Sequence, residues 1–184
     1  MARSKYLVAA ALAALSVPAI ASVTIVGNSS ARLCYEAADS PLTPTVADLR
    51  TCDQAFTEDA LSRRDTVATH VNRGILRLRR GHVDEAIADF DQAIALDPRQ
   101  PEAYLNKGAA LIRLNNPAEA LGLFTVALEY NTRRPEIAHF GRAIANETLG
   151  NVREAYRDYR RASELDPDWQ DPRTELARFR VVSE

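Results

Sequence analysis

The sequence predicts an all-α solenoid in which three helix-turn-helix units stack between an N-terminal helical hairpin and a C-terminal capping helix. The first observation is a phrase from Gly81 to Pro98, parts of which return 34 residues later and then 35 residues after that. The second is that the apolar residues of each copy fall on one face of a helix. The third is that prolines lie where helices would begin or end. A fixed period of this length is typical of helical repeat proteins.

The predicted helices come in pairs. Ser62 and Asp65 have the spacing of a capping box, which starts a helix, and Gly81 ends that helix. The other boundaries follow from prolines and from apolar periodicity. Helices are expected over residues 62–80, 83–96, 101–114, 117–130, 135–149, 152–165 and 172–182. The repeat domain then covers residues 62–184, with units at about 67–100, 101–134 and 136–169 and a capping helix at about 172–182.

Residues 1–21 have the pattern of an export signal. A basic start is followed by an apolar run, and residues 19–21 (Ala-Ile-Ala) form a small-x-small cleavage site. We therefore expect cleavage after Ala21 and export of the mature chain, with the periplasm as its location. The alternative is an uncleaved membrane anchor, continued by the apolar residues up to Val26.

Net charge argues against nucleic acid as the main partner. The full sequence has a formal charge of −2, and loss of Arg3 and Lys5 with the signal would make it −4. A protein that binds nucleic acid usually carries a basic patch, and this mildly acidic chain has no basic block.

Residues 22–61 are predicted to form the N-terminal hairpin. After an extended lead, helices are expected over residues 31–38 and 45–56, with Thr43 as the N-cap before Pro44.

Cys34 and Cys52 lie one on each of these two helices. An even pair of cysteines in an exported chain favours a disulfide, so we expect Cys34 and Cys52 to be bonded. A redox-active pair would need a Cys-x-x-Cys spacing, and a zinc site would need further ligands nearby. Neither is present in the sequence.

Five positions of the repeat carry residues typical of a known family. The matching positions hold a small residue at 8, alanine at 20 and 27, an aromatic residue at 24 and, in units one and three, proline at 32, which Thr132 replaces in unit two. The sequence resembles the tetratricopeptide repeat family, which implies a right-handed superhelix with a concave groove. The resemblance covers the chain from about Val67 to the C-terminus. The residues at positions 8, 20, 24 and 27, which would form the repeat core, are Gly74, Ala86, Phe90 and Ala93, then Gly108, Ala120, Phe124 and Ala127, then Ala143, Ala155, Tyr159 and Ala162.

The resemblance also implies which residues line the groove, since the family lines it with positions 5, 6, 9, 12 and 13 of each first helix. Here these positions are Val71, Asn72, Ile75, Leu78 and Arg79, then Leu105, Asn106, Ala109, Ile112 and Arg113, then Phe140, Gly141, Ile144, Glu147 and Thr148. The floor is apolar, with two asparagines and two arginines as polar groups. The lysine-asparagine clamp by which related repeats hold a C-terminal carboxylate is absent at positions 5 and 9. We expect an amphipathic helix or an extended peptide as the ligand. The alternative is that the chain's own tail covers this surface.

Position 7 carries a cation in all three units, namely Arg73, Lys107 and Arg142. Position 23 is an acid in units one and three, so Asp89 and Asp158 could pair with the arginines of their own units. This structural interpretation competes with a basic stripe that binds an acidic tail.

Three further side chains near these positions are His70, His139 and Arg77. His70 and His139 share position 4 and are interpreted as packing residues rather than bases. Arg77 stands where the family usually has a large apolar residue. It is expected either to run its stem along the surface to water or to meet an acid of the N-terminal hairpin.

No motif for catalysis, cofactor or metal binding is present in the sequence, and neither a small-molecule substrate nor a nucleic acid is expected. We therefore expect a non-catalytic adaptor that binds another protein or a peptide. The alternative is a structural scaffold of the envelope, either homo-oligomeric or held at the membrane by a retained signal. An enzyme would need clustered acid and base groups in a pocket.

Overall fold

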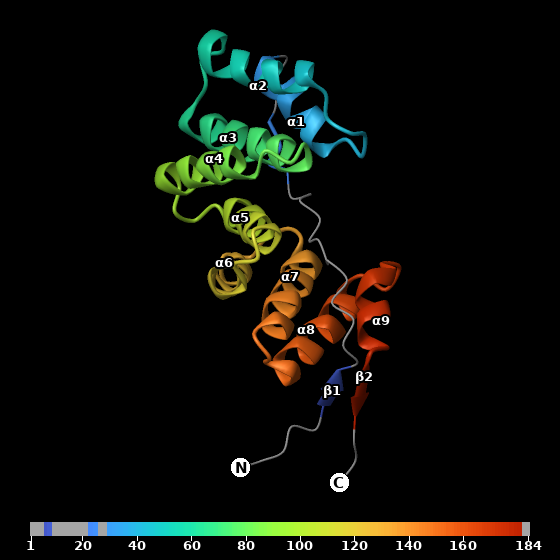
Figure 1. The fold of residues 1–184 in the computed structure, drawn as a ribbon. Helices are drawn as coiled ribbons and strands as arrows, with labels where there is room; N and C mark the ends of the chain where they lie inside the picture. Colours follow the sequence, from blue (N-terminus) through green and yellow to red (C-terminus); the bar gives the residue numbers. More distant parts are fainter. Residues whose placement is uncertain (1–5, 9–21, 26–28, 182–184) are drawn as a thin grey trace.

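The computed structural model describes residues 6–8, 22–25 and 29–181. Within this part of the chain, an α-solenoid is flanked by a helical hairpin and by a short C-terminal cap (Figure 1). The predicted fold class is confirmed. The elements are β1 (Tyr6–Val8), α1 (Ser30–Asp39), α2 (Val46–Glu58), α3 (Arg63–Arg79), α4 (Val83–Leu96), α5 (Pro101–Arg113), α6 (Pro117–Glu129), α7 (Pro135–Thr148), α8 (Val152–Leu165), α9 (Gln170–Leu176) and β2 (Phe179–Val181).

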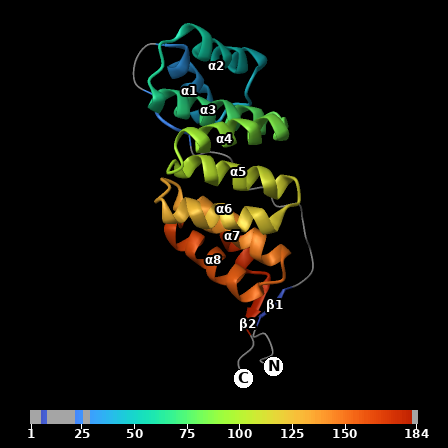
Figure 2. The same cartoon turned by 90° about the vertical axis from the view of Figure 1, so that its left-hand side faces the viewer.

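The stack is built from the helix pairs α3–α4, α5–α6 and α7–α8, which follow one another as layers in Figure 2. The first helices of the units also contact each other, α3 with α5 and α5 with α7. Gly81 and Gly150, which follow α3 and α7, have φ angles of 84° and 79°. Glycine adopts this left-handed backbone without steric cost, which explains the sharp turn into the second helix of units one and three, and Asn115, with φ 55°, takes this place in unit two.

The core lies between the two helices of each unit and between neighbouring units. All repeat-core alanines and aromatic residues are fully buried. A Cβ atom added to Gly74 would lie 2.5 Å from Cε1 of Phe90, so only glycine lets the two helices of unit one approach this closely. Unit three has Ala143 at this position, and there the close approach falls at Gly141, which meets Phe124 of unit two.

The N-terminal hairpin packs α1 on α2, and both helices contact α3. The predicted Cys34–Cys52 disulfide is confirmed. It crosslinks a hairpin whose own apolar content is small, which is where a crosslink contributes most.

Two predicted helix starts have different outcomes. Ser62 caps α3 as expected, because its hydroxyl accepts a hydrogen bond from the backbone N–H of Asp65. The prediction of Thr43 as the cap of α2 was wrong. Thr45 is the cap, since its hydroxyl accepts from the N–H of Asp48 and the Asp48 carboxylate accepts from the N–H of Thr45 at 2.6 Å.

The C-terminal cap differs from the single helix expected over 172–182. The helix α9 begins at Gln170 and ends at Leu176, and β2 then pairs antiparallel with β1, with Arg180 opposite Leu7 (Figure 1). The ring of Phe179 packs against Tyr156 and Tyr159, with centroid distances of 5.7 and 5.8 Å. This packing holds Phe179 on α8.

A single tryptophan contributes to the same end of the molecule. The ring of Trp169 lies 4.6 Å from that of Phe140 in α7, measured between centroids. Its indole N–H donates to Asp171 at 3.1 Å.

The predicted export signal over residues 1–21 lies outside the described residues except for Tyr6–Val8, which form β1. Among the described residues, no helix has both the length and the apolar character needed to cross a bilayer.

Candidate functional site

The residues predicted to line the groove lie on α3, α5 and α7, the three first helices that contact one another. Ile112 is half-buried and Arg113 is exposed. Glu147 is half-buried and Thr148 is exposed. The other apolar side chains of the groove are buried: Val71, Ile75, Leu78, Leu105, Ala109, Phe140 and Ile144.

Asn72 of α3 binds the backbone of the chain's own N-terminal segment. Its amide oxygen accepts a hydrogen bond from the N–H of Val23, and its amide nitrogen donates to the carbonyl of Val23, both at 2.8 Å. The side chain of Asn72 is fully buried. One asparagine therefore satisfies both backbone groups of a single residue in the segment.

Residues 22–25 extend across several elements from this point. The Ser22 hydroxyl donates to the Asp39 carboxylate of α1 at 2.7 Å. The Arg133 guanidinium, in the loop before α7, donates to the Thr24 hydroxyl at 3.4 Å. At unit one the groove is thus covered by the chain itself, not by its tail as the alternative had it but by residues 22–25, which we name the lead segment.

Asn106 occupies in α5 the position that Asn72 occupies in α3. It is also fully buried, and its amide donates to the carbonyl of Glu102 at 2.9 Å. Unit three has Gly141 at this position. The two asparagines therefore lie on consecutive units, and the series ends there.

The two arginines predicted at one rim of the groove bind backbone carbonyls. Arg79 donates to the carbonyls of Ser40, at 2.7 Å, and of Leu42. Arg113 donates to the carbonyl of Leu78, in the last turn of α3. The last carbonyls of a helix lack partners within it, so an arginine there ties one element to the next.

A buried cluster of charged side chains lies between α3 and α4 in unit one. The predicted Arg73–Asp89 pair is confirmed, with Nη2 of Arg73 at 2.7 Å from Oδ1 of Asp89. Arg77 also contacts Asp89, at 2.7 Å, so both predictions for Arg77 were wrong: it meets an acid of its own unit. Nδ1 of His70 lies 3.1 Å from the same carboxylate, so His70 is not only a packing residue. Arg73 further contacts Asp53 of α2 at 2.7 Å.

The pKa of Asp89 is the balance of two opposing effects. Burial alone would raise the pKa, but hydrogen bonds from His70 and Arg73 and the charges of Arg73 and Arg77 lower it below its ordinary value. The carboxylate is therefore held ionised by its partners.

Unit three repeats this arrangement between α7 and α8. The predicted Arg142–Asp158 pair is confirmed at 2.8 Å, and Nδ1 of His139 lies 2.8 Å from Oδ1 of Asp158. Burial would raise the pKa of Asp158, and the hydrogen bonds from His139 and Arg142 lower it overall. In both clusters the aspartate is paired with basic groups of its own unit, and Arg73 also pairs with Asp53 of the hairpin, which favours a structural role over a binding stripe.

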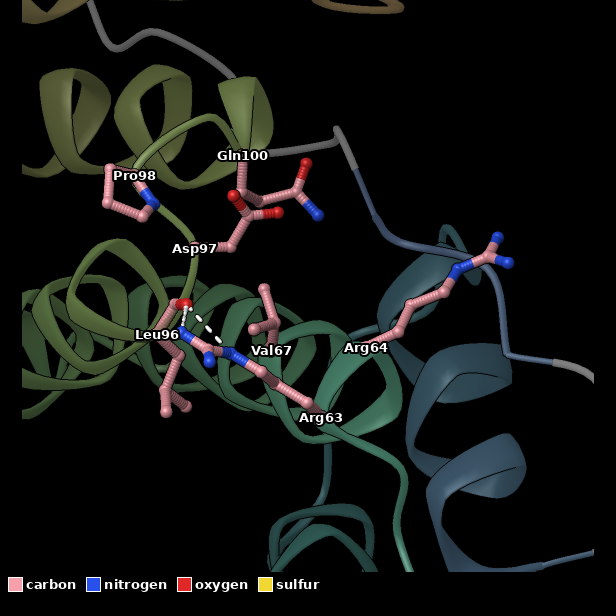
Figure 3. A pocket seen from close by; sticks show the side chains of 7 residues that line it. All are labelled: Arg63, Arg64, Val67, Leu96, Asp97, Pro98 and Gln100. Carbon is pink, nitrogen blue, oxygen red and sulfur yellow. Dashed lines mark hydrogen bonds between the residues drawn. The ribbon is translucent and has the colours of Figure 1, made fainter.

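The described residues line at least two cavities between units. One, of about 370 Å³, is lined by residues at the start of α3, the end of α4 and the start of α5 (Figure 3). In it the Arg63 guanidinium donates to the carbonyl of Leu96 at 3.1 Å, and Arg64 points the other way. A second, of about 360 Å³, lies against α6, α7 and α8 and includes Arg142 and Asp158. In each cavity, some of the charged groups hold helices together: Arg63 binds the end of α4, and Arg142 pairs with Asp158.

Among the described residues, no group of three histidine, cysteine, aspartate or glutamate side chains is placed to hold a metal ion. The sequence predicted the helices of the groove and an extended lead before the hairpin, but not the contact of that lead with α3, which joins residues 49 positions apart. It also missed the histidine in each charged cluster.

The comparisons with known proteins agree with this architecture. A sequence profile described as "Tetratricopeptide repeat" matches residues 71–135 and 110–172, which together span more than half of the chain. A DnaJ homolog subfamily C member 7 homolog of Schizosaccharomyces pombe is 32% identical over 114 residues, which are 60% of this chain and 24% of that protein. The chain thus spans about a quarter of the length of this relative.

Two solved structures share the fold. The first TPR domain of Spaghetti (RPAP3), bound to the HSP90 peptide SRMEEVD, has a TM-score of 0.58 and 28% identity, over 61% of this chain and 88% of that one. MamA from Desulfovibrio magneticus RS-1 has a TM-score of 0.62 over 81% of this chain and 82% of that one. At 18% identity the second likeness concerns the fold alone.

Proposed function

Because the chain belongs to the tetratricopeptide repeat family, we propose that it is a non-catalytic interaction module whose concave groove binds an extended segment of another protein. The ligand lies along α3, α5 and α7. It is held by apolar side chains of the floor and by the asparagines of units one and two.

One observation carries this proposal: Asn72 hydrogen-bonds both the N–H and the carbonyl of Val23. These contacts need only a backbone, and they need it extended, because a helical backbone uses the same groups internally. The observation therefore favours an extended peptide over the amphipathic helix that the sequence left equally open.

The neighbouring structure of RPAP3 supports peptide binding by a domain of this kind, since it contains the HSP90 peptide SRMEEVD. The mode of binding differs here. At positions 5 and 9 this chain has Val71 and Ile75 in unit one and Leu105 and Ala109 in unit two, in place of a lysine-asparagine clamp. We expect apolar anchors along the ligand, rather than a terminal carboxylate, to supply the affinity.

The proposal includes export to the periplasm, after cleavage behind Ala21. It is supported by the pattern of residues 1–21 in the sequence and by the disulfide, which persists in oxidising compartments.

The experiment that tests groove binding uses a matched pair of substitutions. Peptides selected from a random phage-displayed library on the full chain are measured by calorimetry against Ile112→Asp and Ile87→Asp. Both isoleucines are half-buried at the edge of the same core, one on α5 and one on the second helix α4. We expect Ile112→Asp to weaken binding by about tenfold or more and Ile87→Asp to leave it nearly unchanged.

Circular dichroism of both variants checks that their helical content is retained. Equal affinities for the two variants, or a library that yields no binding peptide, would contradict the proposal.

A further inference from the structure

The lead segment has the burial pattern of an extended chain seated on a surface. Val23 is 8% exposed and Ile25 is 4% exposed, whereas Thr24 between them is exposed. Side chains two apart point to the same side of an extended backbone. Both inward side chains are aliphatic and β-branched, and both belong to the same apolar cluster as the repeat helices.

The contacts of the lead segment divide into two kinds. Asn72 binds the backbone of Val23 and therefore carries no preference for a side chain. Selectivity comes from the two inward positions, which take β-branched aliphatic groups, and from the residue before them. That residue is Ser22, whose hydroxyl donates to Asp39. The surface therefore selects chiefly two aliphatic residues separated by any one residue, with a hydrogen-bond donor before them as a weaker preference.

The polar contacts at the two ends of the lead segment are weak ones. Asp39 and Thr24 are both exposed, and the Arg133–Thr24 hydrogen bond is long at 3.4 Å. Exposed hydrogen bonds of this type contribute little net free energy, because water replaces them on opening. The segment is joined to the groove by its own chain, so it competes with any free peptide at a high effective concentration.

From this geometry we infer that the lead segment is a built-in ligand of the groove, and that the partner is an extended peptide of the same chemistry that displaces it. This inference rests on the proposed function and specifies it. The partner carries a donor residue followed by β-branched aliphatic residues two positions apart. Its apparent affinity is lowered by the fraction of molecules in which the lead segment is seated.

The test compares the full chain with a variant whose lead segment cannot seat. Val23→Asp/Ile25→Asp places two carboxylates where aliphatic groups are buried, which disfavours seating. The probe is a synthetic peptide with the sequence of residues 22–28, Ser-Val-Thr-Ile-Val-Gly-Asn. We expect the variant to bind this probe about tenfold or more tightly than the wild-type chain does, measured by calorimetry.

The matched control is Leu33→Asp/Val46→Asp. It adds the same charge at two aliphatic positions of the hairpin that are 55% and 59% exposed. This control is expected to bind the probe as the wild-type chain does. A second probe with aspartate at both inward positions should bind neither variant, whereas a probe with aspartate only at the position of Thr24 should bind as the first.

Two outcomes overturn the inference, and each is separable from failure of the proposed function. If the Val23→Asp/Ile25→Asp chain binds the probe no more tightly than the wild-type chain, the lead segment does not compete for the groove. If this variant binds library-selected peptides but not the probe, the groove binds ligands of other chemistry. In both cases the proposed function stands on its own test with Ile112→Asp.

Discussion

Units one and three place charged side chains between their two helices, where unit two places an apolar one. In units one and three, positions 4, 7 and 23 hold histidine, arginine and aspartate, and the aspartate is buried among its partners. Unit two has Tyr104, Lys107 and Leu123 at these positions. Leu123 needs no partner, so Lys107 turns to the exposed carboxylate of Asp91 at 2.7 Å. The Tyr104 hydroxyl donates to the carbonyl of Pro98 at 2.9 Å.

The difference shows what a buried charge requires. An aspartate between two helices is tolerated only where donors converge on it, and in unit one two arginines and a histidine do so. A leucine fills the same place without any of them. Replacing a buried ion pair by apolar residues is often neutral or stabilising, whereas removing one partner is strongly destabilising. The charged units are therefore expected to be more sensitive to single substitutions than unit two.

The largest expected effect is that of Asp89→Ala. This substitution leaves Arg73 and Arg77 partly buried without their shared carboxylate, which costs about 3–5 kcal/mol of the free energy of unfolding. Urea denaturation followed by circular dichroism measures it. The control is Asp91→Ala, two residues further along α4, where the side chain of the acid is 50% exposed and the expected loss is about 1 kcal/mol or less. Equal losses at the two positions would break the comparison between buried and exposed acids.

Acid is expected to remove stabilisation from units one and three, whose buried aspartates become protonated, whereas unit two has a leucine at that position. The pKa values of Asp89 and Asp158 are lowered in the folded state, so the unfolded chain binds more protons at acidic pH. Their stabilisation is fully present above the unfolded pKa of about 4 and is lost as the pH falls through the lower folded values. We expect the urea midpoint to fall steeply below about pH 4.

The residues of unit two can be transferred to unit one to sharpen this prediction. The variant His70→Tyr/Arg73→Lys/Arg77→Leu/Asp89→Leu gives unit one the residues found 34 positions later. Its urea midpoint should depend less on pH below about pH 4 than that of the wild-type chain. An unchanged pH dependence would show that other carboxylates control acid unfolding.

The smallest effect is expected at Lys107→Ala. The ion pair with Asp91 involves a carboxylate that is half exposed, and such pairs contribute about 1 kcal/mol or less. The same change in unit three, Arg142→Ala, removes a guanidinium that makes two hydrogen bonds to Asp158, at 2.9 and 2.8 Å, and should cost more. Thermal denaturation of the two variants compares them directly. If Lys107→Ala were the more damaging change, position 7 would not depend on its acid as proposed.

The repeat units and their helices could be predicted from the sequence because the signal is local and recurs. Ala86, Phe90 and Ala93 lie on one face of one helix, and their equivalents return in phase twice. Each repetition is an independent observation of the same packing. The C-terminal cap has no second copy. In its short segment from Leu176 to Val182, apolar residues are interrupted by Arg178 and Arg180, a pattern that fits a helix or a strand equally well, and Phe179 becomes part of a strand beside α8.

The candidate site was only partly predictable for the same reason. Asn72 could be placed on the groove from its position in the repeat, but Val23 could not be assigned to it. Four extended residues show no periodicity that would identify their neighbours, and the contact spans 49 positions. His70 was interpreted from its own helix, while its partner Asp89 lies on the next one. Contacts between elements depend on side-chain direction across the interface, which a single sequence does not encode locally.

The packing of Trp169 on Phe140 has an optical consequence. It is the only tryptophan in the chain, and its partner lies on α7 at a position that lines the groove. Its emission therefore reports on unit three and the C-terminal cap, whereas the far-ultraviolet signal of the helices reports on the whole stack. Because a repeat protein is stabilised by contacts between neighbouring units, the two signals separate whenever one end of the stack frays before the other. Trp169 thus reports on the end of the solenoid opposite the N-terminal hairpin.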